Sequence, residues 1–173
     1  GLNNLIQRSL MIKKAMIEID EFDNGPRNVF NYGHSFGHAL ESGTNYLVPH
    51  GIAVCFGMDL ANCISVRMEL VGKEFRNKIR VTLARLWSKA DLSTFDDETF
   101  FAALRRDKKN EGSTIKVILT RGFGQMFKTT LIPDKDMKKM ISEYFANKQW
   151  EKDCLLYTSP SPRDRTRSRM PSS

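Results

Sequence analysis

Apolar side chains recur at three- and four-residue steps near the start of the chain. This spacing predicts an amphipathic helix over residues 2–19, with one face made of Leu5, Ile6, Ser9, Ile12, Met16 and Ile19. Residues 20–26 then combine acidic side chains with Asn, Gly and Pro, which is typical of a loop. The helical spacing returns after this loop and predicts a second helix over about residues 32–45.

The helical pattern continues through most of the remaining chain. Residues 49–51 (Pro-His-Gly) interrupt it before a third helix, whose buried face is expected to contain Val54, Met58, Ala61 and Ser65. A fourth helix is predicted from the spacing of Phe75, Ile79, Leu83 and Leu86. A short fifth helix, capped by Asp96 or Asp97, would bury Phe100, Phe101 and Leu104. After Pro133 and Asp134, a last helix is predicted with an apolar face of Met137, Ile141 and Phe145.

A different pattern occupies the region between the fifth and the last helix. Residues 115–120 and 126–131 are β-like runs, and they flank a Gly-Phe-Gly turn at 122–124. The two runs predict a β-hairpin. The fold class expected from the whole pattern is therefore mainly α, with one small β-hairpin.

The last twenty residues do not fit this pattern. Residues 154–164 match the translation of a transposase-type sequencing adapter, and residues 168–173 match the constant sequence that follows a barcode in such adapters. The three residues between the two matches fit the barcode itself. We therefore expect one domain over residues 1–153 and a non-native, disordered tail over residues 154–173.

Removing this tail changes how the net charge is interpreted. The formal charge of the whole chain is +7, and the tail contributes four Arg and one Asp, so 7 − 3 leaves +4 for residues 1–153. Within the domain the basic residues are scattered instead of interleaved with aromatic ones. This argues against nucleic acid as a partner and suits a small anionic molecule.

Other features of the sequence bear on location. Cys55, Cys63 and Cys154 are odd in number and lack paired spacing, so we expect no disulfide framework and a reducing, cytoplasmic setting. No apolar run approaches the ~20 residues that span a bilayer, so no membrane partner is expected. The chain opens directly into a helical pattern without a secretory leader or an initiator Met, and we expect it to begin inside a larger protein.

The strongest chemical signal is a group of histidines. His34 and His38 are four residues apart on a predicted helix, so their rings share one face, and His50 stands at a loop–helix junction. Gly33 and Gly37 flank His34 at a cost in helix stability, which suggests that a ligand or another backbone approaches closely there. Two or three histidines and a carboxylate would suit Zn²⁺ or a similar ion.

Cationic and polar residues accompany the histidines, namely Lys13, Lys14, Arg27, Asn31, Lys108 and Lys109. Solvated surface positions would explain them. A forked Arg and several Lys near a metal would also suit a substrate that carries both a carboxylate and a phosphate.

Three segments carry a resemblance to a known family. The stretch IDEFDNGPRNVFNYGHSFGHALES (residues 19–42) resembles the histidine-containing signature of dehydroquinate synthases, and PHGIAVCFGM (49–58) is similar to their His-Gly-Glu segment. RDKKNEGSTIKVILTRGFG (106–124) resembles the family's Asp-Lys-Lys segment. The segments occur in the family's order and spacing, so the resemblance covers residues 1–150.

This resemblance implies the helical C-terminal domain of a sugar phosphate cyclase, without the N-terminal Rossmann-like domain that binds NAD. It implies that His34 and His50 are two of three ligands to Zn²⁺ or Co²⁺, and that the third, a glutamate, lies upstream of Gly1. His38 matches the residue that contacts phosphate and helps proton transfer. Asp23 matches a carboxylate near the phosphate. The full-length enzyme would be a homodimer.

The resemblance also implies how the substrate is held. Asn31 and one of Lys108 and Lys109 match phosphate-contacting positions, while Lys13 and Arg27 match residues that hold a carboxylate. The implied reaction of the shikimate pathway converts 3-deoxy-arabino-heptulosonate 7-phosphate to 3-dehydroquinate and releases phosphate. NAD carries the hydride chemistry and the metal polarises an oxygen.

Two departures leave other functions open. Asp23 and Ile52 both stand where the family usually has Glu, which leaves room for a related cyclase acting on another sugar phosphate.

An unrelated histidine metalloenzyme would need a third ligand within this chain, for which Glu41 is the best candidate, although a supporting or surface role explains Glu41 better. A non-catalytic helical binding module is the alternative from another class. The isolated chain is expected to be inactive.

Overall fold

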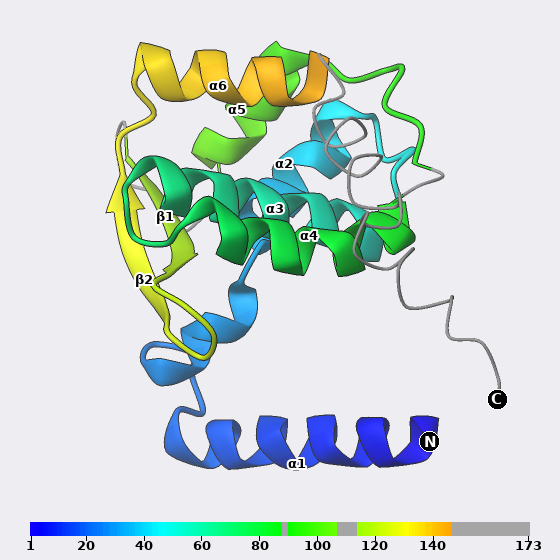
Figure 1. Ribbon diagram of the computed structural model, residues 1–173, viewed down its shortest axis with the longest axis vertical. Helices are drawn as coiled ribbons and strands as arrows, with labels where there is room; N and C mark the ends of the chain where they lie inside the picture. Colours follow the sequence, from blue (N-terminus) through cyan, green and yellow to red (C-terminus); the bar gives the residue numbers. More distant parts are fainter. Residues whose placement is uncertain (88–89, 107–113, 147–173) are drawn as a thin grey trace, which may run out of the picture.

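The computed structural model describes residues 1–87, 90–106 and 114–146, which form helices and a two-stranded sheet (Figure 1). In chain order the elements are α1 (Leu2–Ile19), the 3-10 helix η1 (Pro26–Asn31), α2 (His34–Gly43), α3 (His50–Arg67), α4 (Lys73–Trp87), α5 (Asp97–Arg106), β1 (Ile115–Thr120), β2 (Met126–Leu131) and α6 (Lys135–Ala146). The predicted fold class, mainly α with one small hairpin, is confirmed. Residues 154–173 lie outside the described residues, so the expected tail stays a prediction.

Helix α3 occupies the centre of the fold, where α2, α4 and β1 pack against it (Figure 1). Its buried residues are Ala53, Phe56, Gly57, Asp59, Leu60, Ala61, Asn62, Ile64 and Ser65. Val54 and Met58, which the spacing placed on the buried face, are only partly buried. A helix with neighbours on several sides buries more than one face, so a single stripe underestimates its burial.

The crossing of α2 and α3 depends on three glycines. A Cβ added at Gly57 would lie 2.0 Å from the carbonyl oxygen of Gly33, and one added at Gly37 would lie 3.0 Å from Cα of Val54. Of the two explanations for the glycines around His34, close approach of another backbone is therefore the observed one. Gly33 has a φ of 79°, a left-handed conformation, and for this reason α2 begins at His34 and not near Tyr32.

Helices α4, α5 and α6 complete the core around α3. The predicted fourth helix is confirmed as α4; of the residues whose spacing indicated it, Leu86 is 54% exposed, and Trp87 is buried instead, stacked on Phe56 with 4.8 Å between ring centroids. At α5 the alternatives for the cap are resolved: the Thr99 N–H donates to Asp96 Oδ2 at 2.7 Å. The predicted apolar face of α6 is confirmed, with Met137, Ile141, Tyr144 and Phe145 buried.

The hairpin lies against α3 and α2. β1 and β2 pair antiparallel from Ile115 opposite Leu131 to Thr120 opposite Met126. The backbone N–H of Thr120 donates to Ser65 Oγ at 3.3 Å, and Ser35 Oγ donates to the carbonyl of Lys116 at 3.1 Å. These bonds fix the hairpin beside the start of α2, where the histidines are.

A buried ion pair links α3, α4 and α6. Asp59 on α3 is fully buried and accepts two hydrogen bonds from Arg76 on α4, at 3.0 and 2.9 Å. Arg80 Nε lies 3.5 Å from Asp59 Oδ2, and the Tyr144 hydroxyl on α6 donates to the same oxygen at 2.8 Å. The carboxylate is therefore neutralised and hydrogen-bonded on several sides, as a buried charge requires.

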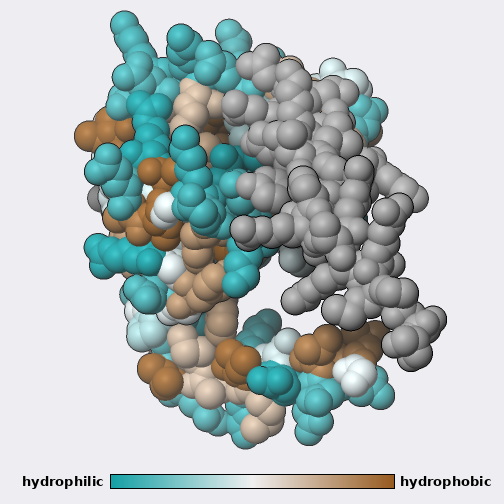
Figure 2. Space-filling model, viewed as in Figure 1, coloured by the Kyte–Doolittle hydropathy of each residue, from teal (hydrophilic) through white to brown (hydrophobic). Residues whose placement is uncertain are grey.

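Helix α1 stands apart from the rest of the fold (Figure 1). It packs against η1, and none of its residues is buried. The helix itself is confirmed, but its apolar side chains lie on the surface, where Figure 2 shows hydrophobic atoms over the lower edge of the molecule. Of the helices that the structure describes, none combines the length and hydropathy that crossing a membrane would require.

Candidate metal and substrate site

The three histidines meet at the junction of α2 and α3. His34 and His38 project from one face of α2, and His50 is the first residue of α3. The ring centroids form a nearly equilateral triangle, with 5.7 Å between His34 and His38, 5.6 Å between His34 and His50, and 5.5 Å between His38 and His50. The three histidines that the sequence groups together thus lie together in space.

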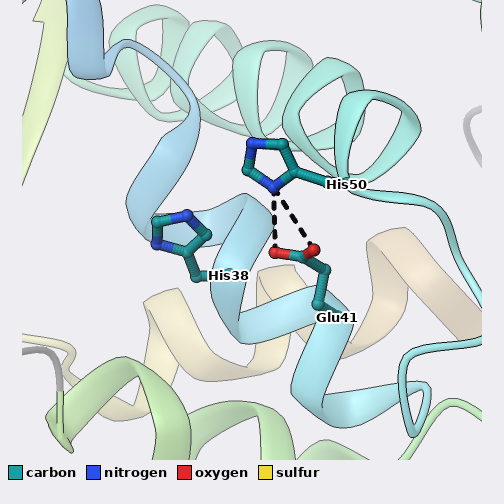
Figure 3. Close-up of side chains that lie close together, drawn as sticks. All are labelled: His38, Glu41 and His50. Carbon is teal, nitrogen blue, oxygen red and sulfur yellow. Dashed lines mark hydrogen bonds and ion pairs between the residues drawn. The ribbon is translucent and has the colours of Figure 1, made fainter.

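Glu41, one turn beyond His38 on α2, joins this group through His50. Nδ1 of His50 lies 3.2 Å from both carboxylate oxygens of Glu41, as the dashed lines in Figure 3 show. The Glu41 side chain is 15% exposed and the His50 side chain is 54% exposed. The other ring nitrogen of His50 points away from the carboxylate (Figure 3).

His34 is the most enclosed of the three rings. It is half-buried, whereas His38 and His50 are exposed. Its Nδ1 lies 3.4 Å from the backbone carbonyl oxygen of Tyr32. Burial lowers the pKa of His34, and the positive charge that His38 and His50 can carry lowers it further, against the opposing effect of the Tyr32 carbonyl. A neutral imidazole is the form that binds metal ions.

A small polar pocket adjoins the histidines, with a cavity volume of ≈ 70 Å³. Its lining residues are Asn28, Asn31, His34, Ser35, His38, Lys116, Val117, Ile118 and Lys128. The amide of Asn31 donates to Asp23 Oδ2 at 2.9 Å, so the predicted site residue Asp23 orients a pocket residue although it does not line the pocket. The pocket is roomy enough for a small anionic group.

Some predicted substrate residues lie elsewhere. Lys13 is exposed on α1 and does not line this pocket. Arg27 turns back over the loop, where its Nη1 donates to the carbonyl oxygens of Asp20 at 3.2 Å and Glu21 at 2.5 Å. Lys108 and Lys109 lie outside the described residues. The structure therefore brings together Asp23, Asn31 and the three histidines, but not Lys13 or Arg27.

The sequence reasoning found Asn31 of η1 but missed Asn28 of the same helix and the contribution of the hairpin to this pocket. Asn28 is buried, and its amide nitrogen donates to the carbonyls of Asp23 at 2.5 Å and Gly25 at 3.1 Å. Its Oδ1 accepts a hydrogen bond from Lys128 Nζ at 2.9 Å, which fixes this ammonium group at the pocket. Lys128 is a hundred residues away in sequence and belongs to no motif, so no local signal marks it.

The donor set fits a transition-metal ion. Ligand atoms of His38, Glu41 and His50 all lie within 4.8 Å of one another, and the His34 ring is next to them. Nitrogen and oxygen ligands on one Zn²⁺ ion lie roughly 3.3 Å apart, so small side-chain rotations would suffice to bind an ion. Imidazole and carboxylate are the ligands that Zn²⁺ and its neighbours in the transition series accept.

Comparison with known proteins gives this site a family context. A protein named 3-dehydroquinate synthase from Campylobacter curvus (strain 525.92) is 34% identical over 145 residues, covering 83% of this chain and 42% of that protein. The protein of the same name from Jannaschia sp. (strain CCS1) is 31% identical over 150 residues, covering 83% of this chain and 40% of that protein. The chain thus spans about two fifths of the length of these relatives.

Solved structures share the fold. A crystal structure of 2-deoxy-scyllo-inosose synthase, complexed with carbaglucose-6-phosphate, NAD⁺ and Co²⁺, matches with a TM-score of 0.59 and 24% identity. The match covers 72% of this chain and 36% of that one. The family model described as 3-dehydroquinate synthase C-terminal matches residues 1–110. This chain therefore belongs to the 3-dehydroquinate synthase C-terminal family.

Proposed function

We propose that this chain supplies the metal- and substrate-binding part of a sugar phosphate cyclase that converts 3-deoxy-arabino-heptulosonate 7-phosphate to 3-dehydroquinate and phosphate. In this proposal the enzyme depends on NAD and on Zn²⁺ or Co²⁺. The NAD-binding domain and a third metal ligand would belong to the part of the relatives' length that this chain does not cover. We expect these 173 residues on their own to be inactive.

One observation carries the proposal. Three histidines from two helices converge with 5.5–5.7 Å between ring centroids, beside a polar pocket lined by Asn31 and two lysines. A metal site next to a phosphate-sized pocket is the arrangement that metal-assisted loss of phosphate from a sugar requires. The names of the relatives agree with this chemistry.

Each residue then has a distinct task. His34 and His50 bind the metal, which when present polarises the reacting oxygen of the substrate. His38, on the pocket side of the triangle, contacts the phosphate and moves a proton. Asp23 holds the Asn31 amide so that Asn31 can bind the phosphate.

Lys128 adds positive charge at the phosphate. Its ammonium group has three N–H donors, and Asn28 accepts one of them. The other two remain for phosphate oxygens, to which an ammonium group makes charge-assisted hydrogen bonds. Lys13 and Arg27 are proposed to hold the substrate carboxylate only after the rest of the enzyme is in place.

A second candidate is a cyclase of the same type that acts on a sugar phosphate without a carboxylate. The orientation of Arg27 favours it, because the guanidinium is occupied by backbone carbonyls of its own loop. Ile52 in place of the family's Glu points in the same direction.

The deciding experiment uses the chain joined to its upstream coding sequence. Phosphate release is measured from 3-deoxy-arabino-heptulosonate 7-phosphate and from glucose 6-phosphate, with and without NAD⁺, and after chelation and return of Co²⁺. Turnover of the heptulosonate alone supports the first candidate, and turnover of glucose 6-phosphate supports the second. If the protein binds NAD⁺ and Co²⁺ but releases phosphate from no sugar phosphate, the proposed function is wrong.

A further inference from the structure

Two of the three histidine rings are held through Nδ1. His50 Nδ1 faces the Glu41 carboxylate at 3.2 Å, and His34 Nδ1 faces the Tyr32 carbonyl oxygen at 3.4 Å. Carboxylate and carbonyl oxygens only accept hydrogen bonds, so each neutral ring must carry its proton on Nδ1. The lone pair of Nε2 is then free on both rings.

The third ring differs. Within the residues that the structure describes, the His38 ring has no hydrogen-bonding partner, although it stacks near His50 with 5.5 Å between centroids. A ring without a fixed partner can exchange its proton between the two nitrogens. This freedom suits proton transfer, whereas fixed tautomers suit metal binding.

We propose that Glu41 and the Tyr32 carbonyl are positioning groups, which hold His50 and His34 as Nδ1–H tautomers and present both Nε2 atoms to one metal ion. This inference rests on the proposed function for the metal but concerns residues to which no role in the reaction has been given. Glu41 then supports His50 instead of binding the ion itself.

Both supports are anchored by the fold. Glu41 follows His38 by one turn of α2, and its mostly buried side chain reaches the first residue of α3. The Tyr32 side chain is buried, and its hydroxyl donates to Asn62 Oδ1 in the middle of α3. Helix α3 thereby fixes the carbonyl that faces His34, which makes Asn62 an indirect support of the same ring.

The competing arrangement places the ion between Glu41, His38 and His50, whose ligand atoms lie within 4.8 Å of one another. In that arrangement Glu41 would bind the ion itself instead of holding His50 through Nδ1. It would also leave out His34, the most enclosed ring of the three. We favour the first arrangement because it uses the hydrogen bonds already present.

The tautomers are measured directly by long-range ¹H–¹⁵N correlation of the imidazole nitrogens in the metal-free 173-residue chain, at about pH 8.5, where histidines are neutral. The expected spectrum has protonated Nδ1 and bare Nε2 for His34 and His50. In Glu41→Ala, His50 should move toward the Nε2–H form while His34 stays unchanged. Glu143→Ala, which removes an exposed carboxylate on α6, is the matched control. A wild-type His50 in the Nε2–H form would overturn the inference.

Co²⁺ alone is then titrated into the same variants joined to the upstream coding sequence, which is proposed to supply the third ligand, and is followed by visible absorption. Glu41→Ala should weaken binding about 10–100-fold, the usual effect of losing a group that supports a metal ligand. Glu41→Gln, which keeps an accepting oxygen and the side-chain shape, should weaken it less. Unchanged affinity in Glu41→Ala, or no Co²⁺ binding by the wild-type protein that includes the upstream coding sequence, would contradict the inference.

The Co²⁺ complex also separates the two arrangements. A histidine bound through Nε2 keeps an exchangeable Nδ1–H proton, which gives a strongly shifted NMR signal near the paramagnetic ion. Two such signals, for His34 and His50, support the inference, and absence of the His50 signal favours Glu41 as a direct ligand. These measurements need no substrate or NAD⁺. The proposed cyclase activity can therefore be absent while His34 and His50 are found as Nδ1–H tautomers. Equally, the activity can be present while these tautomers are not found.

Discussion

The carbonyl oxygen of Gly33 lies so close to Gly57 that a Cβ at position 57 would be only 2.0 Å from it. Helices α2 and α3 therefore cross with their backbones in direct contact. This contact sets how far His34 and His38 on α2 lie from His50 on α3. The geometry of the histidine triangle thus depends on residues that carry no functional group.

Gly57→Ala should destabilise the chain by ~3 kcal/mol or more, because the contact is between backbones and no side chain can move aside. Gly51→Ala is the matched control in the same helix, where an added Cβ meets nothing within 4 Å. That variant should be neutral or up to ~1 kcal/mol more stable, since alanine favours helix. Urea unfolding monitored by circular dichroism measures both. Equal stabilities of the two variants would contradict the close crossing.

Asp59→Ala should cost about 3–5 kcal/mol, because it removes the carboxylate that lies beside the buried charges of Arg76 and Arg80. Tyr144→Phe removes a single hydrogen bond to the same carboxylate and should cost only ~1–2 kcal/mol. Chemical unfolding of the two variants gives the comparison. A loss in Asp59→Ala no greater than that in Tyr144→Phe would show that the arginines do not need this carboxylate.

Asp96 should make stability depend on pH in the acid range. Hydrogen bonds from the Thr99 side chain and backbone lower the pKa of Asp96. A carboxylate with a lowered folded-state pKa contributes stability above its unfolded-state value, and that contribution is lost as the pH falls through the folded-state value. The free energy of unfolding should therefore fall more steeply below about pH 4 in the wild type than in Asp96→Asn.

Asparagine is also a good helix cap, so Asp96→Asn should change stability little at neutral pH. Glu98→Gln removes an acid from the first turn of the same helix without touching the cap, and serves as the control. Urea titrations at a series of pH values test the difference. If the free energy of unfolding of the wild type and of Asp96→Asn changed with pH in parallel, the Asp96 cap would not be a source of the pH dependence.

Lys128→Met should raise the KM for the sugar phosphate about 10- to 150-fold in the enzyme that includes the upstream coding sequence, because a charged hydrogen bond contributes roughly 1.5–3 kcal/mol. Lys139→Met, on the exposed surface of α6, is the matched control and should leave KM unchanged. The pocket and the Asn28 contact motivate the prediction. Steady-state phosphate release gives KM, and an unchanged value in Lys128→Met would remove this lysine from the substrate site.

Much of the fold follows from local pattern. The spacing of Met137, Ile141 and Phe145 predicted the buried face of α6, because a helix with one covered side shows its periodicity directly. The same reasoning was incomplete for α3 and did not indicate which residues at the end of α4 are buried. There the neighbours in space, three elements around α3 and Phe56 beside Trp87, decide which side chains are buried.

The features of the candidate site also fall into those that the sequence predicts and those that only the structure reveals. By itself the sequence determined the helices, the hairpin, and the i, i+4 pairing of His34 with His38, since these depend on residues close together in the chain. Only the tertiary structure decided that Glu41 faces Nδ1 of His50 and that Lys128 reaches the pocket through Asn28. Such contacts join residues up to a hundred positions apart. They depend on how elements distant in the chain pack against one another, which the spacing of neighbouring residues does not specify.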